Sequence, residues 1–272
     1  MQFVDRAFAR RLESCEEMPQ VEYARVFQKT RPEIGAAVET ICGGHMVFAG
    51  LGSPIGRATG AGLDLPLTAE DVDRIEEFYR AHLAPAQVDL CPLHGPEMFE
   101  MFKERGYAIA ELNNVLYQKL EKNEDFPAPA QGCEIRRARL EDAEITGAIV
   151  EKAFFPEGAP EAFRGLITPL YQMQNALAFV AHIEGKLVAC GTGVIIPEHR
   201  VFALCGAGTL AQHRRRGLQT ALLRARMRAA AEAGCEYAVV VTQGGTTSQR
   251  NAEGLGFRVA YSKVTVVKKL EP

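Results

Sequence analysis

One stretch of this chain, TLAQHRRRGLQTALL at 209–223, constrains its fold more than any other. It leads from an apolar, strand-like segment at 201–210 into a strongly helical run, with three arginines at 214–216 and Gly217 where the helix would begin. The first amides of a helix lack intrahelical partners, and the helix dipole makes that end partly positive. Arginines are unfavourable there unless an anion binds, and a glycine lets the anion approach the backbone. The stretch therefore predicts a strand–loop–helix unit that binds phosphate; a solvated arginine cluster is the alternative.

The same stretch resembles motif A of the GNAT acyltransferase superfamily, in which Arg or Gln, two residues, Gly, one residue and Gly or Ala open a helix. Arg214, Gly217 and Gln219 stand at the three defining places, and Gln219 departs from the last. The resemblance implies acetyl-CoA as co-substrate and no metal. It also implies two sets of cofactor contacts. The strand end would meet the acyl end and the pantetheine with the backbone of Thr209, Leu210 and Ala211. The pyrophosphate would meet the amides and arginine side chains of Arg214, Arg215, Arg216, Gly217, Leu218, Gln219 and Thr220.

Length and composition bound the other possibilities. At 272 residues the chain is too long for one such module and suits two. A net charge of −3 argues against a nucleic-acid-binding surface. No apolar run approaches the roughly 18 residues of a membrane span, and the charged N-terminus does not look like a secretory signal. Seven scattered cysteines, without metal-binding spacing, favour reduced thiols, so we expect a cytoplasmic protein with no membrane partner.

A charged and then Pro/Ala-rich segment (EKNEDFPAPAQG) predicts a linker between two domains. We place domains at 1–122 and 133–272, with the linker at 123–132. In the second, strands and helices are expected at 133–138, 140–155, 160–174, 177–183, 186–196, 201–210, 218–233 and 237–242, with a hairpin turn at Glu184-Gly185. This order resembles the GNAT order over residues 133–270. In the first domain, a helix over 3–34 is expected to break or kink at Pro19.

The two halves look related. ERGYAIAELNNVLYQKL, ending at Leu120, aligns without a gap with GLGFRVAYSKVTVVKKL, ending at Leu270. Chance similarity of two amphipathic segments is the alternative. The fold class we expect is α/β (α+β), with two GNAT-like domains, each a mixed, mostly antiparallel sheet flanked by helices. The first half has no arginine loop, so we expect it to cover the second and to wall one side of the substrate cleft.

The chemistry that the resemblance implies is direct attack of an amine on the thioester. Ser248 or Asn251 would bind the pantetheine arm, although Ser248 equally suits a helix cap. The family's usual acid, a tyrosine four residues before the Gly-Phe glycine, is Ala252 here. Tyr261 is a substitute candidate, with packing on a strand as the alternative.

Two further side chains are candidates for catalysis: His182, on a hairpin strand, and Cys205, for which a buried inert thiol is the alternative. The predicted function is an acetyl-CoA-dependent N-acetyltransferase whose partner is a small-molecule amine acceptor. A non-catalytic acyl-CoA-binding or sensing protein and a protein N-acetyltransferase are the alternatives. Pairing of sheet edges makes a homodimer possible.

Overall fold

The structure is a computed structural model that describes residues 2–121 and 132–270. The chain forms two compact units. The N-terminal unit comprises Met1–Tyr117, Val241–Gln249 and Arg258–Pro272, and the C-terminal unit comprises Gln118–Val240 and Arg250–Phe257. Of the predicted linker at 123–132, only Gly132 lies within the described residues. The units also differ from a division at that linker, because the end of the chain joins the N-terminal unit.

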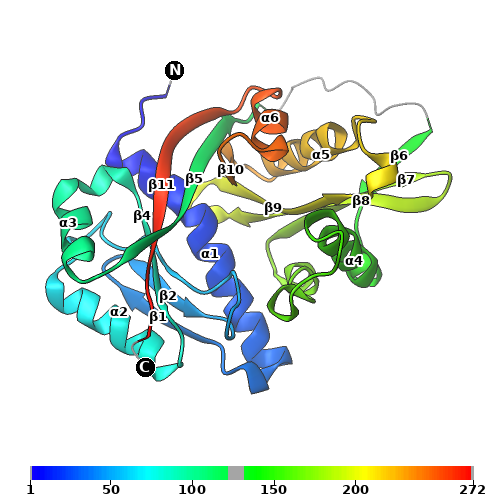
Figure 1. Ribbon diagram of the computed structural model, residues 1–272. Helices are drawn as coiled ribbons and strands as arrows, with labels where there is room; N and C mark the ends of the chain where they lie inside the picture. The colour runs from blue at the N-terminus through cyan, green and yellow to red at the C-terminus, as the bar shows by residue number, and fades with distance from the viewer. Residues whose placement is uncertain (1, 122–131, 271–272) are drawn as a thin grey trace. The chain divides into compact units, whose positions relative to one another are not determined.

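The N-terminal unit is a six-stranded sheet with helices on both faces (Figure 1). Its strand order is β1-β2-β3-β4-β11-β5. Val47 packs with α1, whereas its neighbours Met46 and Phe48 pack with residues of α2, which places the two helices on opposite faces. The helices are α1 (Arg6–Thr30), α2 (Ala69–Ala81) and α3 (Pro96–Glu104), with 3-10 turns at Pro32–Ile34 and Pro92–His94. The strands are β1 (Ala37–Ile41), β2 (Gly44–Phe48), β3 (Ala58–Thr59), β4 (Ala86–Leu90), β5 (Ala108–Lys119) and β11 (Arg258–Lys268).

The last strand, β11, explains why the chain end belongs to this unit. It pairs antiparallel with β4 from Val264 to Lys268 and with β5 from Arg258 to Val267. Both neighbours come from the first half of the sequence. A strand held on both edges forms part of the sheet interior, so the N-terminal unit is incomplete without the last residues of the chain.

The predicted break at Pro19 is wrong, because α1 runs through it as one helix of 25 residues. Asp5 caps this helix by accepting a hydrogen bond from the Phe8 amide at 2.8 Å. The residues around the proline, among them Cys15 and Val21, are buried. Packing of the helix against the sheet therefore outweighs the roughly 3 kcal/mol that an internal proline costs an isolated helix.

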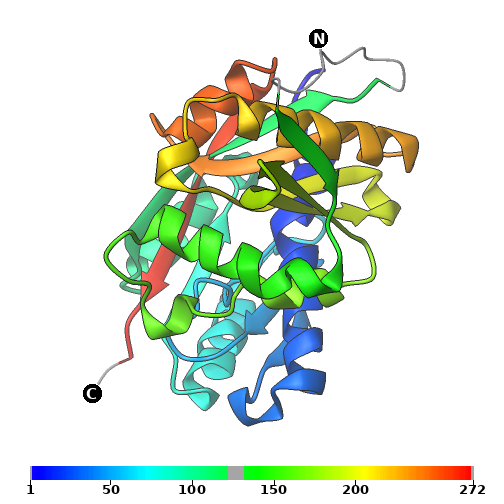
Figure 2. The ribbon, with the colours of Figure 1, turned by 90° about the vertical axis from the view of Figure 1, so that its right-hand side faces the viewer.

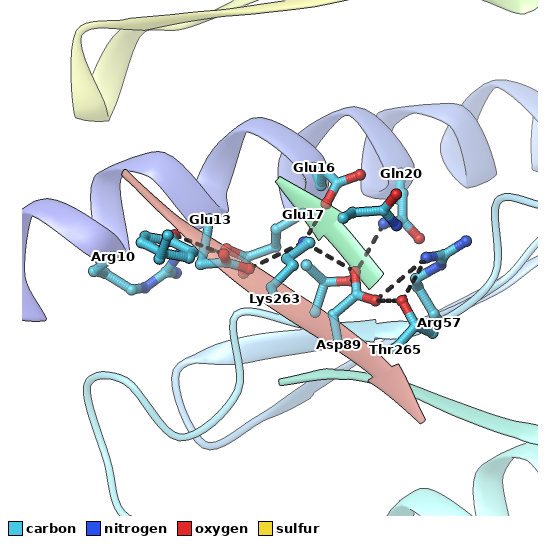
Figure 3. A network of polar contacts seen from close by, with 12 residues as sticks. Arg10, Glu13, Glu16, Glu17, Gln20, Arg57, Asp89, Lys263 and Thr265 are labelled. Carbon is cyan, nitrogen blue, oxygen red and sulfur yellow. Dashed lines mark hydrogen bonds and ion pairs between the residues drawn. The ribbon is translucent and has the colours of Figure 1, made fainter. Parts of the chain in front are cut away.

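A buried network of charged side chains lies between α1 and the strands of this unit (Figure 3). Lys263 of β11 is at its centre, with Nζ 3.2 Å from Glu13 Oε2 and 3.1 Å from Asp89 Oδ2, and it also pairs with Glu16. Arg57 extends the network, with Nη1 3.3 Å from Asp89 Oδ1. Burial alone would raise the pKa of Asp89, but Lys263 and Arg57 outweigh it and hold that pKa below its usual value. The network fixes the last strand to the first helix.

The C-terminal unit is a sheet of order β10-β9-β8-β7-β6 between two helices. In Figures 1 and 2, α4 and α5 lie on opposite faces of β7, β8 and β9. The strands are β6 (Cys133–Arg137), β7 (Ala176–Ile183), β8 (Lys186–Ile196), β9 (Val201–Thr209) and β10 (Tyr237–Gln243). The helices are α4 (Ala143–Phe154), α5 (Leu218–Glu232) and α6 (Thr247–Glu253), with 3-10 turns at Leu140–Asp142, Glu161–Phe163, Thr168–Gln172, Pro197–His199 and Ala211–His213. The division at 241–249 assigns the end of β10 and the start of α6 to the N-terminal unit.

The predicted helix over 160–174 is wrong: two 3-10 turns stand there, separated by Gly165 with φ 72°. That left-handed conformation cannot continue a helix. The predicted hairpin is confirmed. Glu184 and Gly185 have φ 51° and 74°, as a two-residue hairpin turn requires, and they join β7 to β8.

The two aligned sequence segments end their helices in the same way. Gly106 after α3 and Gly256 after α6 have φ 79° and 89°. The amide of the next residue then bonds to a helix carbonyl, from Tyr107 to Phe102 at 3.1 Å and from Phe257 to Ala252 at 3.2 Å. Identical helix ends feeding β5 and β11 support a duplication. No helix in the described residues is long and apolar enough to cross a membrane.

Candidate functional site

The predicted strand–loop–helix unit is present in the C-terminal unit. β9 ends at Thr209, a 3-10 turn follows, and α5 begins after Gly217. Gly217 is the N-cap of α5 with φ 72° and ψ 6°, and no side chain caps the helix. A Cβ at Gly217 would meet no protein atom within 4 Å. The start of α5 is therefore open to a ligand at the position where the sequence predicted phosphate.

The first amides of α5 point into this opening. The first intrahelical bond runs from the Ala221 amide to the Gly217 carbonyl at 3.0 Å, so the amides of Leu218, Gln219 and Thr220 precede the hydrogen-bond ladder. Among the described residues, no carboxylate pairs with Arg214, Arg215 or Arg216. Positive charge therefore accumulates at the positive end of the helix dipole without compensation from the protein, as an anion site requires.

The three arginines differ in what their side chains do. Arg214 is turned back into the protein: its Nε donates to the Thr209 carbonyl at 3.3 Å and its Nη2 to the Ala153 carbonyl at 3.2 Å. All three arginines are exposed, and Arg215 has φ 60°, an uncommon conformation for a residue with a Cβ. Arg214 thus braces the loop through two carbonyls, whereas the side chains of Arg215 and Arg216 make no hydrogen bond or ion pair within the described residues.

Gln219, the departure from the motif, points away from the opening. Its Nε2 lies 2.9 Å from the Gly208 carbonyl, 2.9 Å from Thr209 Oγ1 and 3.2 Å from the Cys190 carbonyl. The side chain thus ties the first turn of α5 to the ends of β8 and β9. A larger residue than Gly or Ala is compatible with the motif because it leaves the anion side free.

The middle of β9 is irregular. Cys190 of β8 faces Gly208 of β9, and Thr192 faces Cys205, so β9 advances three residues where β8 advances two. The extra residue makes a bulge at Gly206, which has φ 50°, and a Cβ there would lie 2.4 Å from Thr192 Oγ1. Bulges of this kind re-aim the backbone next to functional sites.

The other edge of β9 is paired over a short distance. Within the described part of the chain, its register with β10 covers only Val201, Phe202 and Ala203. The strand continues to Thr209, and positions 205–207 are partly exposed whereas the rest is buried. Residues 205–207 are therefore not paired with β10 in that part of the chain, and the Cys205 carbonyl accepts a hydrogen bond from Thr192 Oγ1 at 3.0 Å. The backbone amide of Leu210, which was predicted to contact the cofactor, donates to the Val188 carbonyl at 3.0 Å instead.

The α6 residues take different places. Thr246, rather than Ser248, accepts the Gln249 amide at 3.3 Å, so the predicted Ser248 cap is wrong and Ser248 is exposed. Asn251 is partly exposed. Ala252, at the place of the family's acid, is 2% exposed.

The candidates for acid, base and nucleophile lie on three different strands, β11, β7 and β9. Tyr261 belongs to the N-terminal unit, where its hydroxyl donates to Glu13 Oε1 at 2.7 Å. Burial and the neighbouring Glu13 raise the pKa of Tyr261, so it holds its proton. His182 lies on β7, two strands away from β9, on the face that carries Asp142. Burial raises the pKa of Cys205, which favours an uncharged thiol.

One residue that the sequence analysis missed lies beneath the bulge. Arg226 of α5 is 1% exposed, and its Nη1 donates to the Thr192 carbonyl at 2.7 Å. A signal for it is present in the sequence, since Leu218, Leu222 and Arg226 are spaced four apart on the buried side of α5. If only apolar character is considered, Ala225 and Ala229 are expected on the buried side of α5 in place of Arg226.

All seven cysteines are free thiols. No cluster of His, Cys, Asp or Glu that would hold a metal occurs in residues 2–121 and 132–270.

Comparison with known proteins identifies a domain in the second half. Residues 146–257 match the model of the acetyltransferase (GNAT) family. No curated protein sequence matches the chain.

Solved structures share the fold over most of the chain. A GCN5-related N-acetyltransferase from Kribbella flavida is 19% identical with a TM-score of 0.63, and the match covers 91% of this chain and 96% of that one. A tandem GNAT protein from the clavulanic acid biosynthesis pathway is 14% identical with a TM-score of 0.61, covering 87% and 79%. A GCN5-related N-acetyltransferase from Sphaerobacter thermophilus is 20% identical with a TM-score of 0.55, covering 75% and 68%. The predicted fold class is confirmed, including its tandem arrangement.

Proposed function

Because the chain contains a GNAT acetyltransferase domain, matched at residues 146–257, we propose that it transfers an acetyl group from acetyl-CoA to the amine of a small molecule. The observation that carries this proposal is the start of α5. Gly217 is left-handed and open, two exposed arginines stand beside it, and no side chain caps the helix. This arrangement suits the pyrophosphate of coenzyme A.

The residues fit the remainder of the cofactor as well. The edge of β9 at 205–207 offers backbone hydrogen bonds to the two amides of the pantetheine arm. Asn251 of α6, partly exposed, is retained as a second contact. The amine attacks the thioester carbon directly and coenzyme A leaves as its thiol, so no covalent enzyme intermediate is needed.

Coenzyme A titrated into the protein tests the anion site. Gly217→Glu places bulk and negative charge at the opening, and we expect affinity to fall by about 2 kcal/mol or more. Gly234→Glu is the matched control. Gly234 lies after the other end of α5, has φ 93°, and likewise has no protein atom within 4 Å of the position that a Cβ would occupy. If both variants bind coenzyme A as the native protein does, the anion site is wrong.

The second candidate function is a non-catalytic acyl-CoA-binding protein. It is favoured by the buried Ala252 at the acid's place and by the engagement of Tyr261 with Glu13. Release of free thiol from acetyl-CoA with a panel of small amines distinguishes the two. Turnover with any amine supports the enzyme, whereas tight binding without turnover over the whole panel supports the binding protein.

A further inference from the structure

A buried positive charge without a counter-ion lies under the bulge of β9. Arg226 is 1% exposed, and within the described residues no carboxylate lies in ion-pair distance of its guanidinium. Burial lowers the pKa of Arg226 to about 10, so it remains a cation at neutral pH. A buried charge is normally paired, because its desolvation costs several kcal/mol. This exception requires a reason.

The strands are shaped to hold this charge. Gly191 of β8 lies against the guanidinium, and a Cβ there would come within 2.6 Å of Arg226 Cζ. The Arg226 Nε donates to the Leu222 carbonyl at 3.1 Å, and Nη1 donates to the Thr192 carbonyl at 2.7 Å. A glycine in the middle of a strand weakens that strand, so making space for Arg226 at Gly191 further destabilises the fold.

Arg226 is connected to the bulge through one residue. Thr192 accepts from Arg226 with its carbonyl, and its Oγ1 donates to the Cys205 carbonyl at 3.0 Å. Cys205 directly precedes Gly206, where β9 bulges and becomes partly exposed. The charge also acts on Cys205 itself, opposing the effect of burial on that thiol. The field of Arg226 therefore reaches the segment at 205–207, along which we place the pantetheine arm that leads to the acyl end of the cofactor.

We propose that Arg226 is a positioning and electrostatic residue for acyl transfer: it holds the bulged segment through Thr192 and stabilises negative charge that develops at the acyl end. This proposal rests on the proposed function. In the reaction, the amine nitrogen forms a bond to the thioester carbon, and the carbonyl oxygen becomes an oxyanion. The C–S bond then breaks and the coenzyme A sulfur leaves as a thiolate; the amine nitrogen gives its proton to solvent, from which the thiolate is protonated to the thiol. Arg226 gives and takes no proton; its fixed charge favours the oxyanion and the thiolate.

The thiol of bound coenzyme A measures this field without knowledge of the acceptor. We would titrate it by its thiolate absorbance, from about pH 6 to about pH 9, as the difference between protein with and without coenzyme A. A nearby positive charge stabilises a thiolate relative to its thiol and so lowers the thiol pKa. We expect the thiol pKa of bound coenzyme A to lie at least about one unit below that of free coenzyme A. An unshifted or higher value in the native protein overturns the proposal.

Two variants separate the charge from the hydrogen bond. Arg226→Gln keeps a donor near Thr192 but removes the charge, and Arg226→Lys keeps the charge. We expect Arg226→Gln to raise the bound thiol pKa by about one unit and to lower kcat roughly tenfold, with KM for acetyl-CoA within about twofold of native. Arg226→Lys should recover most of both effects. Arg228→Gln, an exposed position on the same helix, is the control.

The melting temperature of Arg226→Gln distinguishes the proposed electrostatic role from a purely structural one, because the two roles predict changes in opposite directions. Removal of an uncompensated buried charge should leave the melting temperature of Arg226→Gln unchanged or higher. A structural brace would instead lower it and leave the thiol pKa unchanged, and that result overturns the proposal. Failure of coenzyme A to bind the native protein is a different outcome, since it refutes the proposed function on which this inference rests.

Discussion

Replacement of Lys263 by methionine tests what the buried network of the N-terminal unit contributes to folding. The Lys263 side chain is 1% exposed, and its ammonium group lies near carboxylates of Glu13 and Asp89 that are 1% and 0% exposed. Methionine keeps most of the aliphatic stem but removes the cation, so the carboxylates are left buried without it. Breaking a buried pair in this way costs about 3–5 kcal/mol of unfolding free energy. We expect a loss of that size in urea unfolding at pH 7.

Lys268→Met on the same strand is the matched control. Lys268 forms an ion pair with Glu76 at 2.9 Å, but its side chain is 30% exposed. A partly exposed pair is worth about 0–1 kcal/mol. The reasoning is refuted if Lys263→Met loses no more stability than Lys268→Met.

The pH dependence gives a second check on Lys263. In the native protein burial would raise the pKa of Asp89, but Lys263 and Arg57 outweigh it and hold that pKa below its usual value. The ionised carboxylate therefore stabilises the folded state, and this contribution to the free energy of unfolding is lost only as pH falls through the lowered pKa. Without Lys263, burial dominates and the pKa of Asp89 and Glu13 should rise. A raised carboxyl pKa makes the folded state bind protons more tightly, so the variant should gain stability as pH falls. The difference between native protein and variant should therefore narrow from about pH 7 to about pH 5.

Three other changes give distinct outcomes. A fragment of residues 1–122 should show no cooperative unfolding transition by circular dichroism, because it lacks β11, the strand between β4 and β5. Adding a segment that carries residues 258–272 should restore the transition. Gln219→Ala should lower stability by about 1–2 kcal/mol but change coenzyme A affinity by less than about threefold, because the Gln219 Nε2 donates to groups of β8 and β9 rather than toward the helix start. A larger loss of affinity by calorimetry would contradict this. Tyr261→Phe removes the hydrogen bond to buried Glu13, so it should lower the free energy of unfolding by about 1–3 kcal/mol without altering turnover. A reduced kcat with unchanged stability would instead support Tyr261 as a catalytic residue.

The sequence was most informative where a short motif determines local structure. Gly217 and the arginines before it predicted an open helix start, and Glu184-Gly185 predicted the hairpin turn. Thr68 caps α2 in a capping box with Asp71, which is likewise a pairing of residues three positions apart. Each of these features depends on residues within a few positions of one another, so the physics that selects them is local.

The features that escaped prediction depend on distant partners. Pro19 remains in a helix because the surrounding residues pack on a sheet formed later in the chain. Nothing near β11 indicates that it joins β4 and β5. The burial of Arg226 depends on Gly191, thirty-five positions earlier, whose missing side chain provides the space.

The buried cations Lys263 and Arg226 differ in whether carboxylates of the protein neutralise their charge, and this difference indicates different roles. Lys263 is surrounded by carboxylates, and each partner lies on another element of its own unit, so the network specifies where the last strand goes. Arg226 has carbonyls but, among the described residues, no carboxylate. A folding role alone would be served better by an apolar side chain at that position. On the function proposed above, acyl transfer at the bulge of β9 would place a transient negative charge beside Arg226, and this would account for a buried cation that has no carboxylate partner among the described residues.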